Sequence, residues 1–421
     1  MPTEKERFEE LIREELLPLF PQSELSETPP RHSHIRAAYS TSHASTAVRL
    51  QPQITSGYAF LISRSQGFEP REKMVMEAFI THLAPLQVAL QPYLAKRLRK
   101  TQMDLVIADA IATTAHNRPT MEIAAFLFEV LEQWAQETYE GHRISAAFGI
   151  ESVASPAKDV STMQNYLRLQ LAKVVGDGCS TLVVLGTDGR VLRHEYLGPP
   201  GQSTKVFAPF AFAPMAAWAT ENRVAIALNR GGEILVFAQG RIIFARRRGQ
   251  WIHFSHQSAV SQMATNGPRG FAADLRLAAY LSALDISFSR AGGGIGLVRR
   301  GESVVGTGLP VQARDELSGR RTEKTKALRT LLGASRYQDL PRPFRQELGA
   351  IDGAVVIQHD GAIITAGAVL AVSVSSDEGA RKTAAKTLGK YGLGMKISSD
   401  GKIEAYTGEP LPDQKPLFEI G

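Results

Sequence analysis

An acidic residue and a cationic segment near the C-terminus have residue types and spacing that suit nucleotide chemistry. Asp352 stands before the apolar run 354–357, and Gly379 opens a segment that contains Arg381 and Lys382. A carboxylate can bind a divalent metal ion or accept a proton, and cations with nearby backbone N–H groups can hold phosphate. The two segments together therefore predict a site for a phosphorylated ligand.

The first segment resembles a motif of a known enzyme family. Asp352-Gly353-Ala354 matches the Asp-Gly-Ala that diadenylate cyclases with a DNA-integrity-scanning-type nucleotide-binding domain carry at a helix–strand junction. The run 363–370 looks like the strand that follows in that family, and 396–403 is similar to its closing hairpin, without the paired glutamates. The resemblance implies the family's mixed-sheet domain, flanked by helices, in the C-terminal part of the chain.

The cationic segment matches the second motif of the same family, Gly-Thr-Arg-His-Arg, only in part. Gly379 and Arg381 agree with it, whereas Ala380, Lys382 and Thr383 stand in place of its Thr, His and second Arg. A hydroxyl in place of a bidentate guanidinium weakens charge stabilisation at phosphate, which Lys382 offsets in part. The order of the two motifs is more specific than either tripeptide alone.

The resemblance implies an enzyme that condenses two ATP molecules into cyclic di-AMP with Mg²⁺ or Mn²⁺. Asp352 would be the metal ligand and proton acceptor, and Arg381 would act with it in catalysis. The implied nucleotide-binding positions are Gly353, Ala354, Gly367, Leu370, Gly379, Lys382 and Thr383. Two such domains would have to meet face to face, which implies a homodimer or higher homo-oligomer. A catalytically degenerate module that binds a nucleotide or cyclic dinucleotide is the alternative.

Length and composition describe an ordinary soluble protein. The 421 residues are 43% hydrophobic and 21% charged, with a formal net charge of +6. That excess suits polyanions such as ATP, although a solvated basic face is its more common explanation. Cys179 is the only cysteine, so no intrachain disulfide can form, as expected in the cytoplasm. No segment has the ~18 uninterrupted apolar residues that predict a membrane span.

Hydrophobic periodicity and Gly-Pro punctuation predict three α/β regions. Residues 1–104 would form a helical and α/β region with a linker, and 105–266 a middle sensor-like domain. The nucleotide-binding domain would occupy 267–421. The boundary at Gly267 predicts that a fragment beginning there folds alone.

The N-terminal region divides by its periodicity. Phe8, Leu11, Ile12 and Leu16 keep helical spacing and predict an opening amphipathic helix. Ser23–Thr46 has no such periodicity and is therefore predicted to be a loop or linker.

The middle and C-terminal regions share a hairpin pattern. Asp188-Gly189 and Asp360-Gly361 each lie between β-branched runs, and Gly232 and Gly401 follow at comparable spacing. Asp-Gly between such runs is a strong hairpin signal, so both regions are predicted to use similar β-hairpin scaffolds. Chance similarity between hairpins is the alternative.

If the two regions are related, their alignment bears on function. Ser180 stands where the C-terminal copy has Asp352, and Phe212 stands where it has Arg381. The middle region would then lack both the carboxylate and the cations. It is predicted to pack, sense or regulate, and not to catalyse in the same way.

Several basic groups could contact nucleic acid but have simpler explanations. The run 96–100 suits a solvated helix end. A second basic patch surrounds Trp251 and could bind an anionic effector or nucleic acid, although a surface strand edge protected by charge explains it equally well; it comprises Arg241, Arg246, Arg247 and Arg248. Lys386 and Lys390, one helical turn apart, are expected on a solvated helix face. Nucleic acid is thus an unlikely partner on sequence grounds.

Overall fold

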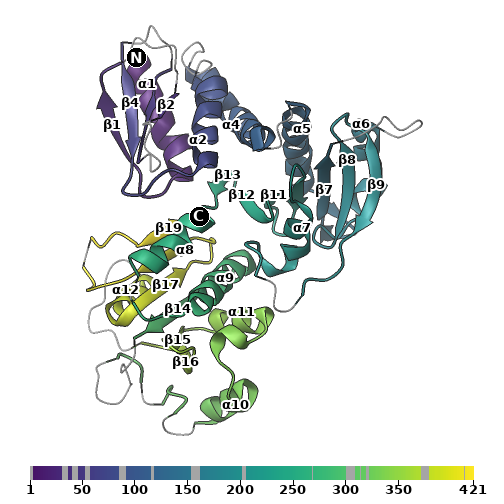
Figure 1. Cartoon of the computed structure of the whole chain (residues 1–421). Helices are drawn as coiled ribbons and strands as arrows, with labels where there is room; N and C mark the ends of the chain where they lie inside the picture. The colour runs from purple at the N-terminus through teal and green to yellow at the C-terminus, as the bar shows by residue number, and fades with distance from the viewer. Residues whose placement is uncertain are drawn as a thin grey trace. The chain divides into compact units, whose positions relative to one another are not determined.

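The computed structural model describes residues 3–30, 37–39, 46–52, 57–84, 92–114, 118–152, 162–201, 205–267, 269–299, 309–312, 314–318, 322–370, 379–411 and 413–421. The chain forms two compact units of mixed α/β structure (Figure 1). The α/β class agrees with the sequence prediction, which divided the chain into three regions. The first unit comprises Met1–Pro199 and Pro214–Phe254, and the second comprises Pro200–Ala213 and Ser255–Gly421.

The opening helix forms where its apolar spacing predicts. α1 (Glu4–Leu11) continues through a π-helical turn (Ile12–Leu16) and a 3-10 turn (Leu17–Leu19). Thr3 and Glu6 form a capping box at its start. The predicted stripe is fully buried and comprises Phe8, Leu11, Ile12 and Leu16.

The segment predicted as a loop, Ser23–Thr46, contains strands. β1 (Glu24–Thr28) pairs antiparallel with β4 (Ala59–Ser63), and β2 (Ala37–Tyr39) pairs with β3 (Ala47–Leu50) in a sheet of order β1-β4-β3-β2. The loop prediction is therefore wrong at β1 and β2. An edge strand such as β1 is defined by backbone pairing, and its polar sequence has no buried face to signal it.

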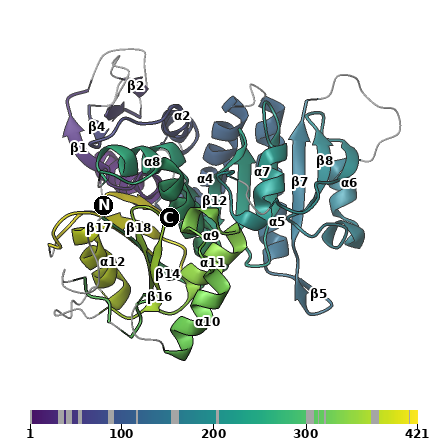
Figure 2. The same cartoon turned by 60° about the horizontal axis from the view of Figure 1, so that its bottom comes forward.

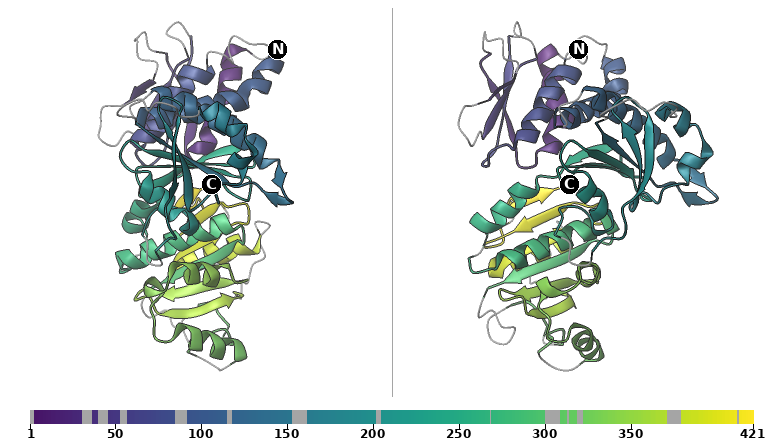
Figure 3. Two further views of the ribbon diagram at one scale, coloured as in Figure 1. Left: turned by 90° about the vertical axis from the view of Figure 1, so that its right-hand side faces the viewer. Right: turned by 45° about the vertical axis from the view of Figure 1, so that its right-hand side comes forward.

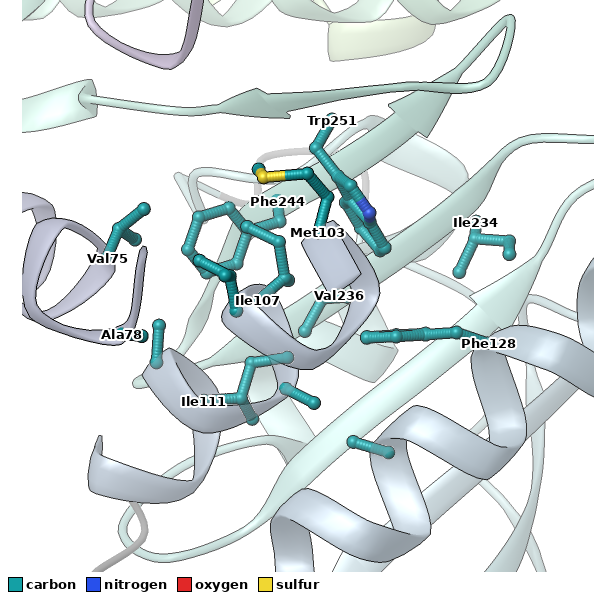
Figure 4. Close-up of a cluster of buried hydrophobic side chains, with 14 of the residues drawn as sticks. Val75, Ala78, Met103, Ile107, Ile111, Phe128, Ile234, Val236, Phe244 and Trp251 are labelled. Carbon is teal, nitrogen blue, oxygen red and sulfur yellow. The ribbon is translucent and has the colours of Figure 1, made fainter. Parts of the chain in front are cut away.

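Helices pack apolar side chains against the larger sheet of the first unit. These helices are α2 (Pro70–Ala78), α4 (Pro92–Thr114) and α5 (Arg118–Ala135). Ile107 of α4 and Phe128 of α5 face Val236 and Trp251 of the sheet (Figure 4). The ring centroids of Phe128 and Trp251 lie 4.8 Å apart.

The larger sheet of the first unit has seven strands in the order β13-β12-β11-β10-β7-β8-β9. Its strands are β7 (Ala146–Glu151), β8 (Thr181–Gly186), β9 (Val191–Tyr196), β10 (Val224–Leu228), β11 (Ile234–Ala238), β12 (Arg241–Arg247) and β13 (Gln250–His253). β7 and β8 are parallel, and the other neighbours are antiparallel. α6 (Met163–Leu167) follows β7, and α7 (Ala213–Trp218) precedes β10.

The second unit has a six-stranded sheet in the order β16-β15-β14-β17-β18-β19. Its strands are β14 (Gly293–Val298), β15 (Ala354–Gln358), β16 (Ile363–Ala368), β17 (Gly392–Ile397), β18 (Ile403–Tyr406) and β19 (Phe418–Ile420). β14 and β15 are parallel, and the rest are antiparallel. The C-terminus follows the edge strand β19 (Figure 3).

Helices cover both faces of this second sheet (Figure 2). They are α8 (His256–Thr265), α9 (Ala273–Ser289), α11 (Arg342–Ala350) and α12 (Ala380–Tyr391). A further helix, α10 (Glu323–Leu332), lies beyond β16 (Figure 1). A Cβ on Gly293 would lie 2.2 Å from the Gly349 carbonyl oxygen of α11, and one on Gly296 would lie 2.9 Å from Leu388 of α12. The glycine run that enters β14 therefore serves close packing of helices on the sheet.

The two larger sheets are built on one plan. The strand order β9-β8-β7-β10-β11-β12 of the first matches β16-β15-β14-β17-β18-β19 of the second, with the parallel pair at the same place. The register shifts between Val184 and Leu185 in one sheet and between Val356 and Ile357 in the other. The predicted hairpins at Asp188 and Asp360 both form.

The central strands of both sheets also carry a glycine at the same register position. Gly149 of β7 packs against the ring of Trp218 in α7, and Gly296 of β14 packs against Leu388 in α12. Gly149 pairs with Val184, and Gly296 pairs with Val356. Shared order, register shift and helix contact extend the likeness well beyond the hairpins themselves.

A buried ion pair holds a distant chain segment in the second unit. Arg342 Nε donates to Asp285 Oδ2 at 2.7 Å, and both side chains are completely buried. Arg342 also donates to the carbonyl oxygens of Val206, at 3.0 Å, and Ala208, while the backbone N–H of Phe210 donates to Asp285 Oδ1 at 2.8 Å. Residues 205–210 are thus an integral part of this unit's core.

The boundary predicted at Gly267 does not coincide with the edge of the second unit. That unit also includes Pro200–Ala213 and the residues of α8. His256 of α8 forms a 2.7 Å hydrogen bond with the hydroxyl of Tyr280, and Phe207 stacks on His256 at 5.1 Å between centroids. A fragment beginning at Gly267 lacks these partners of Tyr280. The structure therefore does not support the sequence-based expectation that this fragment folds alone.

Two arginines predicted to lie at a charged surface strand edge are buried instead. Arg246 pairs with Asp104 at 3.3 Å and with Glu132 at 3.1 Å, and Arg247 pairs with Glu233 at 3.3 Å. Both arginine side chains are only 4% exposed. Carboxylates from α4, α5 and the β10–β11 turn neutralise these cations, which a strand sequence alone does not reveal.

None of the described helices combines the length and the apolar character that crossing a bilayer requires.

Candidate functional site

Strand register brings the first motif to one edge of the second unit's sheet. Gly294 pairs with Ala354 in parallel, and Ala354 pairs with Ala368 in antiparallel. Gly293 pairs with Ile397, the last residue of β17. The beginnings of β14 and β15 and the ends of β16 and β17 therefore meet here.

The second motif reaches the same edge because α12 runs back along β17. α12 ends at Tyr391 and β17 begins at the next residue, so the N-terminus of the helix lies near the end of β17. A Cβ on Gly292 would lie 2.9 Å from Nη1 of Arg381 and 3.3 Å from the carbonyl oxygen of Ile397. Arg381 and Asp352 thus belong to one edge, which we call the Asp352 edge.

Asp352 stands where α11 passes into β15. α11 ends at Ala350, and both Ile351 and Asp352 are exposed. Gly353 has φ +106°, and a Cβ there would lie 2.6 Å from the carbonyl oxygen of Ala368. Only glycine fits this corner. Within the part of the chain that the structure describes, no hydrogen bond or ion pair involves the Asp352 carboxylate.

Gly367 backs this corner from β16. It has φ +66°, and a Cβ there would lie 2.5 Å from Cγ2 of Ile351 and 3.2 Å from the carbonyl oxygen of Asp352. The ammonium of Lys324 donates to the carbonyl oxygen of Gly367 at 2.6 Å. A second cation therefore lies at the Asp352 edge, on the β16 side.

The Asp352 edge carries charge in an order that suits an anionic ligand. Lys324 contacts the end of β16, Asp352 lies two residues before β15, and Arg381 lies against the residue before β14. Neighbouring strands lie about 4.8 Å apart, so β16 and β14 are about 10 Å apart. Asp352 stands between the two cations along this row.

The first turn of α12 adds backbone donors and one further cation. Gly379 is its N-cap with φ +86° and offers no capping side chain. The first-turn N–H groups and the helix dipole favour an anion at this end. The hydroxyl of Thr383 donates to the carbonyl oxygen of Gly379 at 3.2 Å, so that proton is used within the helix.

Lys382 lies close enough to the sheet for its charge to act on a carboxylate of β18. It is half-buried, and its charge contributes to lowering the pKa of Glu404 on β18. Burial of Glu404 acts in the opposite direction, but the hydrogen bond from Lys396 at 2.5 Å and the neighbouring lysines outweigh it and leave the pKa lowered. Lys382 therefore has a structural partner in addition to any ligand.

Two predicted nucleotide-binding residues lie in the core. Ala354 is 3% exposed and Leu370 is 8% exposed. Both belong to an apolar cluster with Val298, Val356 and Leu388. Leu370 stabilises the end of β16 in this cluster, and contact with an adenine ring stays a prediction.

Asp352 is the carboxylate that the sequence assigns to a metal ion. No group of three or more His, Cys, Asp or Glu side chains suited to a metal occurs among the described residues. Mg²⁺ commonly binds through one or two carboxylates together with substrate phosphates. An exposed single carboxylate between cations fits a metal ion that arrives with a triphosphate, and does not fit a permanent all-protein metal site.

The other lysines of α12 separate by burial. Lys386 is 5% exposed, and its ammonium donates to the carbonyl oxygen of Leu411 at 3.2 Å, so the expectation of a solvated face is wrong for it. Lys390 is exposed and pairs with Glu409 at 3.3 Å, as expected of a solvated face.

The corresponding edge of the first unit is closed by its own hydrogen bonds. The carboxylate of Asp177 accepts from the backbone N–H groups of Cys179 at 3.0 Å and Ser180 at 2.8 Å, and from the hydroxyls of Ser180 and Thr181. Partial burial opposes ionisation, yet these donors hold the pKa of Asp177 well below its ordinary value. That carboxylate is saturated, unlike Asp352.

Sequence reasoning missed Lys324. It lies 28 positions before Asp352 on a helix with no counterpart in the quoted motifs. The capping box formed by Thr322 and Thr325 signals where α10 begins. No sequence signal indicates that the helix start lies against Gly367.

Comparison with known proteins adds no family assignment. No protein-family model matches the sequence, and a search of curated proteins found no match either.

Proposed function

We propose that this protein is a nucleotidyltransferase of the diadenylate cyclase type, which joins two ATP molecules into cyclic di-AMP at the Asp352 edge. The observation that carries the proposal is the meeting of the two motifs at this edge. Strand register and the return of α12 bring Asp352 and Arg381 together from positions 29 residues apart. The exposed carboxylate and the flanking cations supply a proton acceptor and charge neutralisation.

In this proposal Asp352 accepts the proton of a ribose 3′-hydroxyl. The hydroxyl oxygen attacks the α-phosphorus of the second ATP, and the bond from that phosphorus to the pyrophosphate oxygen breaks. Two such steps form two phosphodiester bonds and release two pyrophosphates. Phosphoryl transfer depends mainly on positioning and charge neutralisation. Arg381, the first turn of α12 and Lys382 hold the phosphates.

Mg²⁺ or Mn²⁺ bound to Asp352 and the triphosphate would neutralise phosphate charge and favour ionisation of the hydroxyl. The chain contributes the carboxylate, and Gly353 lets the backbone approach the nucleotide without a Cβ clash.

The reaction needs two Asp352 edges, and one copy of the chain offers a single such edge, in its second unit. Two copies of the chain related by a twofold axis would set each 3′-hydroxyl opposite the partner's α-phosphate. The first unit does not supply the second site, since Ser180 stands in place of the carboxylate and Asp177 is saturated by hydrogen bonds. We therefore propose a homodimer or larger homo-oligomer as the active form.

Incubation of the purified chain with ATP and Mg²⁺ or Mn²⁺, followed by mass spectrometry of the products, tests the proposal. Asp352→Asn should abolish the product, because it removes the anion and keeps the shape. Asp360→Asn is the matched control, since this exposed carboxylate lies in the hairpin turn at the other end of β15. Product from Asp352→Asn at the wild-type rate would exclude Asp352 from the reaction.

A binding module without turnover is the second candidate, and Thr383 favours it. The family has a second arginine at this position, whereas the Thr383 hydroxyl donates within α12. Stoichiometric binding of ATP or cyclic di-AMP by calorimetry, with no product after prolonged incubation, would support this candidate over the enzyme.

A further inference from the structure

Lys324 connects three separate parts of the second unit. Its ammonium donates to the carbonyl oxygen of Gly367 at 2.6 Å and lies 3.3 Å from Oδ1 of Asp315. Asp315 is only 12% exposed at its side chain. The ammonium therefore links α10 and the segment around Asp315 to the end of β16.

The segment around Asp315, which Lys324 contacts, is itself held against β16 by a backbone hydrogen bond. Leu317 donates its N–H to the carbonyl oxygen of Ile364 in β16 at 2.8 Å. Thr322 and Thr325 cap α10 reciprocally, so the helix begins at Glu323 and Lys324 is its second residue. Side chains of a helix point back toward its N-terminus, which directs Lys324 toward the segment around Asp315.

The carbonyl that Lys324 holds belongs to the residue that backs Asp352. The position of a Cβ on Gly367 lies 3.4 Å from Nζ of Lys324, 3.2 Å from the carbonyl oxygen of Asp352 and 2.5 Å from Ile351. Gly367 has φ +66°, a left-handed conformation that glycine adopts readily and that lets its carbonyl point toward Lys324. Support from Lys324 at this carbonyl therefore bears directly on the geometry of the Asp352 corner.

We propose that Lys324 is a positioning residue for the Asp352 edge, which holds the backbone of Gly367 against Asp352 and sets a positive charge beside the bound nucleotide. The expected effect of Lys324 on catalysis rests on the proposed nucleotide function. The support that Lys324 gives to the backbone of Gly367 does not depend on that function. An ammonium has three donors, and the two described contacts leave one for a phosphate or hydroxyl oxygen of the ligand.

Hydrogen–deuterium exchange of the full-length protein without nucleotide tests the structural part. Lys324→Met keeps the length of the side chain and removes its charge and donors. We expect faster exchange of backbone amides in 365–369 and 351–353 than in the wild type. Lys326→Met is the matched control, because Lys326 lies on the same helix and pairs only with exposed Glu323 among the described residues. Unchanged exchange in Lys324→Met overturns the inference.

Steady-state kinetics with ATP tests the catalytic part. A misplaced carboxylate costs alignment in the transition state, so kcat of Lys324→Met should fall on the order of tenfold to a hundredfold, with KM changed far less. Lys324→Arg retains the charge with a different donor geometry, and should recover only part of kcat. Full recovery by Arg, or a loss confined to KM, would show a charge effect and overturn the positioning role.

The two tests separate this inference from the proposed function. If the wild type forms no product while exchange at 365–369 responds to Lys324→Met, the enzyme proposal fails and the positioning of Gly367 by Lys324 stands. If Lys324→Met does not fold, Lys324→Arg supplies the exchange comparison. Normal exchange in that variant together with normal kcat would overturn the inference.

Discussion

Replacement of Arg342 by Met should loosen the core that delivers Asp352. Arg342 is the first residue of α11, and the helix ends two residues before Asp352. Its guanidinium bonds both oxygens of Asp285, at 2.7 and 2.8 Å, and two carbonyl oxygens of segment 205–210. Both charged side chains are completely buried. Arg342→Met therefore leaves a carboxylate in the core without its counterion.

The expected cost follows from that burial. Removal of one partner of a buried ion pair destabilises by about 3–5 kcal/mol, because the remaining charge stays desolvated. A domain's whole stability is about 5–15 kcal/mol, so the second unit should lose a large part of its stability. Arg342→Met combined with Asp285→Leu removes both charges and should cost less than Arg342→Met alone, although Phe210 N–H and two carbonyls lose partners.

Hydrogen exchange is the appropriate measurement, because it reports local opening in each unit separately and the two units need not unfold in one transition. Amides of 205–213 and α11 should exchange faster in Arg342→Met, while those of the first unit's sheet should not. Arg336→Met, at an exposed arginine near the start of α11, is the control. Equal protection in Arg342→Met and wild type, or a double variant less stable than Arg342→Met, would refute this account of the core.

Three further predictions concern phosphate binding, pH and the domain boundary. Arg381→Ala should weaken ATP binding more than adenosine binding in calorimetry, because in the proposed site the guanidinium would hold the phosphates; equal losses would indicate general unfolding. Burial raises the pKa of Asp104 from 3.8 to about 6, although the hydrogen bond from Trp251 acts in the opposite direction. Because the pKa is higher in the folded than in the unfolded state, protonation of Asp104 stabilises the folded first unit. This stabilisation is complete below pH 3.8 and is lost as pH rises through 6. Fluorescence-detected unfolding from pH 4 to 7 should show this decline, and Asp104→Asn should flatten it; an equally steep decline would exclude Asp104 as the titrating group. A fragment beginning at Gly267 should have a lower melting temperature than the second unit within the full-length protein, since it lacks segment 205–213 and α8. Equal melting temperatures would contradict this.

Local sequence signals predicted much of the scaffold. Asp188-Gly189 and Asp360-Gly361 specify tight hairpins, because few residues adopt the required backbone conformation. The apolar spacing from Phe8 to Leu16 specifies a helix face. These features depend on neighbouring residues alone, so they could be predicted without knowledge of the tertiary fold.

Features that depend on distant partners could not be predicted in this way. Lys324 and Gly367 are 43 residues apart, and Arg342 and Val206 are 136 apart. Arg246 and Lys386 are buried because a carboxylate or a carbonyl from another element reaches them. The two motifs predicted a shared site, but only the sheet register explains why Asp352 and Arg381 lie on one edge.

The specific rate of cyclic di-AMP synthesis across a dilution series tests most directly whether two Asp352 edges join two ATP molecules. Product would be identified by mass spectrometry, and the oligomeric state of each sample measured by light scattering. We predict that the rate per chain falls in step with the fraction of dimer or larger assembly. A rate per chain that stays constant down to proven monomer, or no product at any concentration, would contradict it.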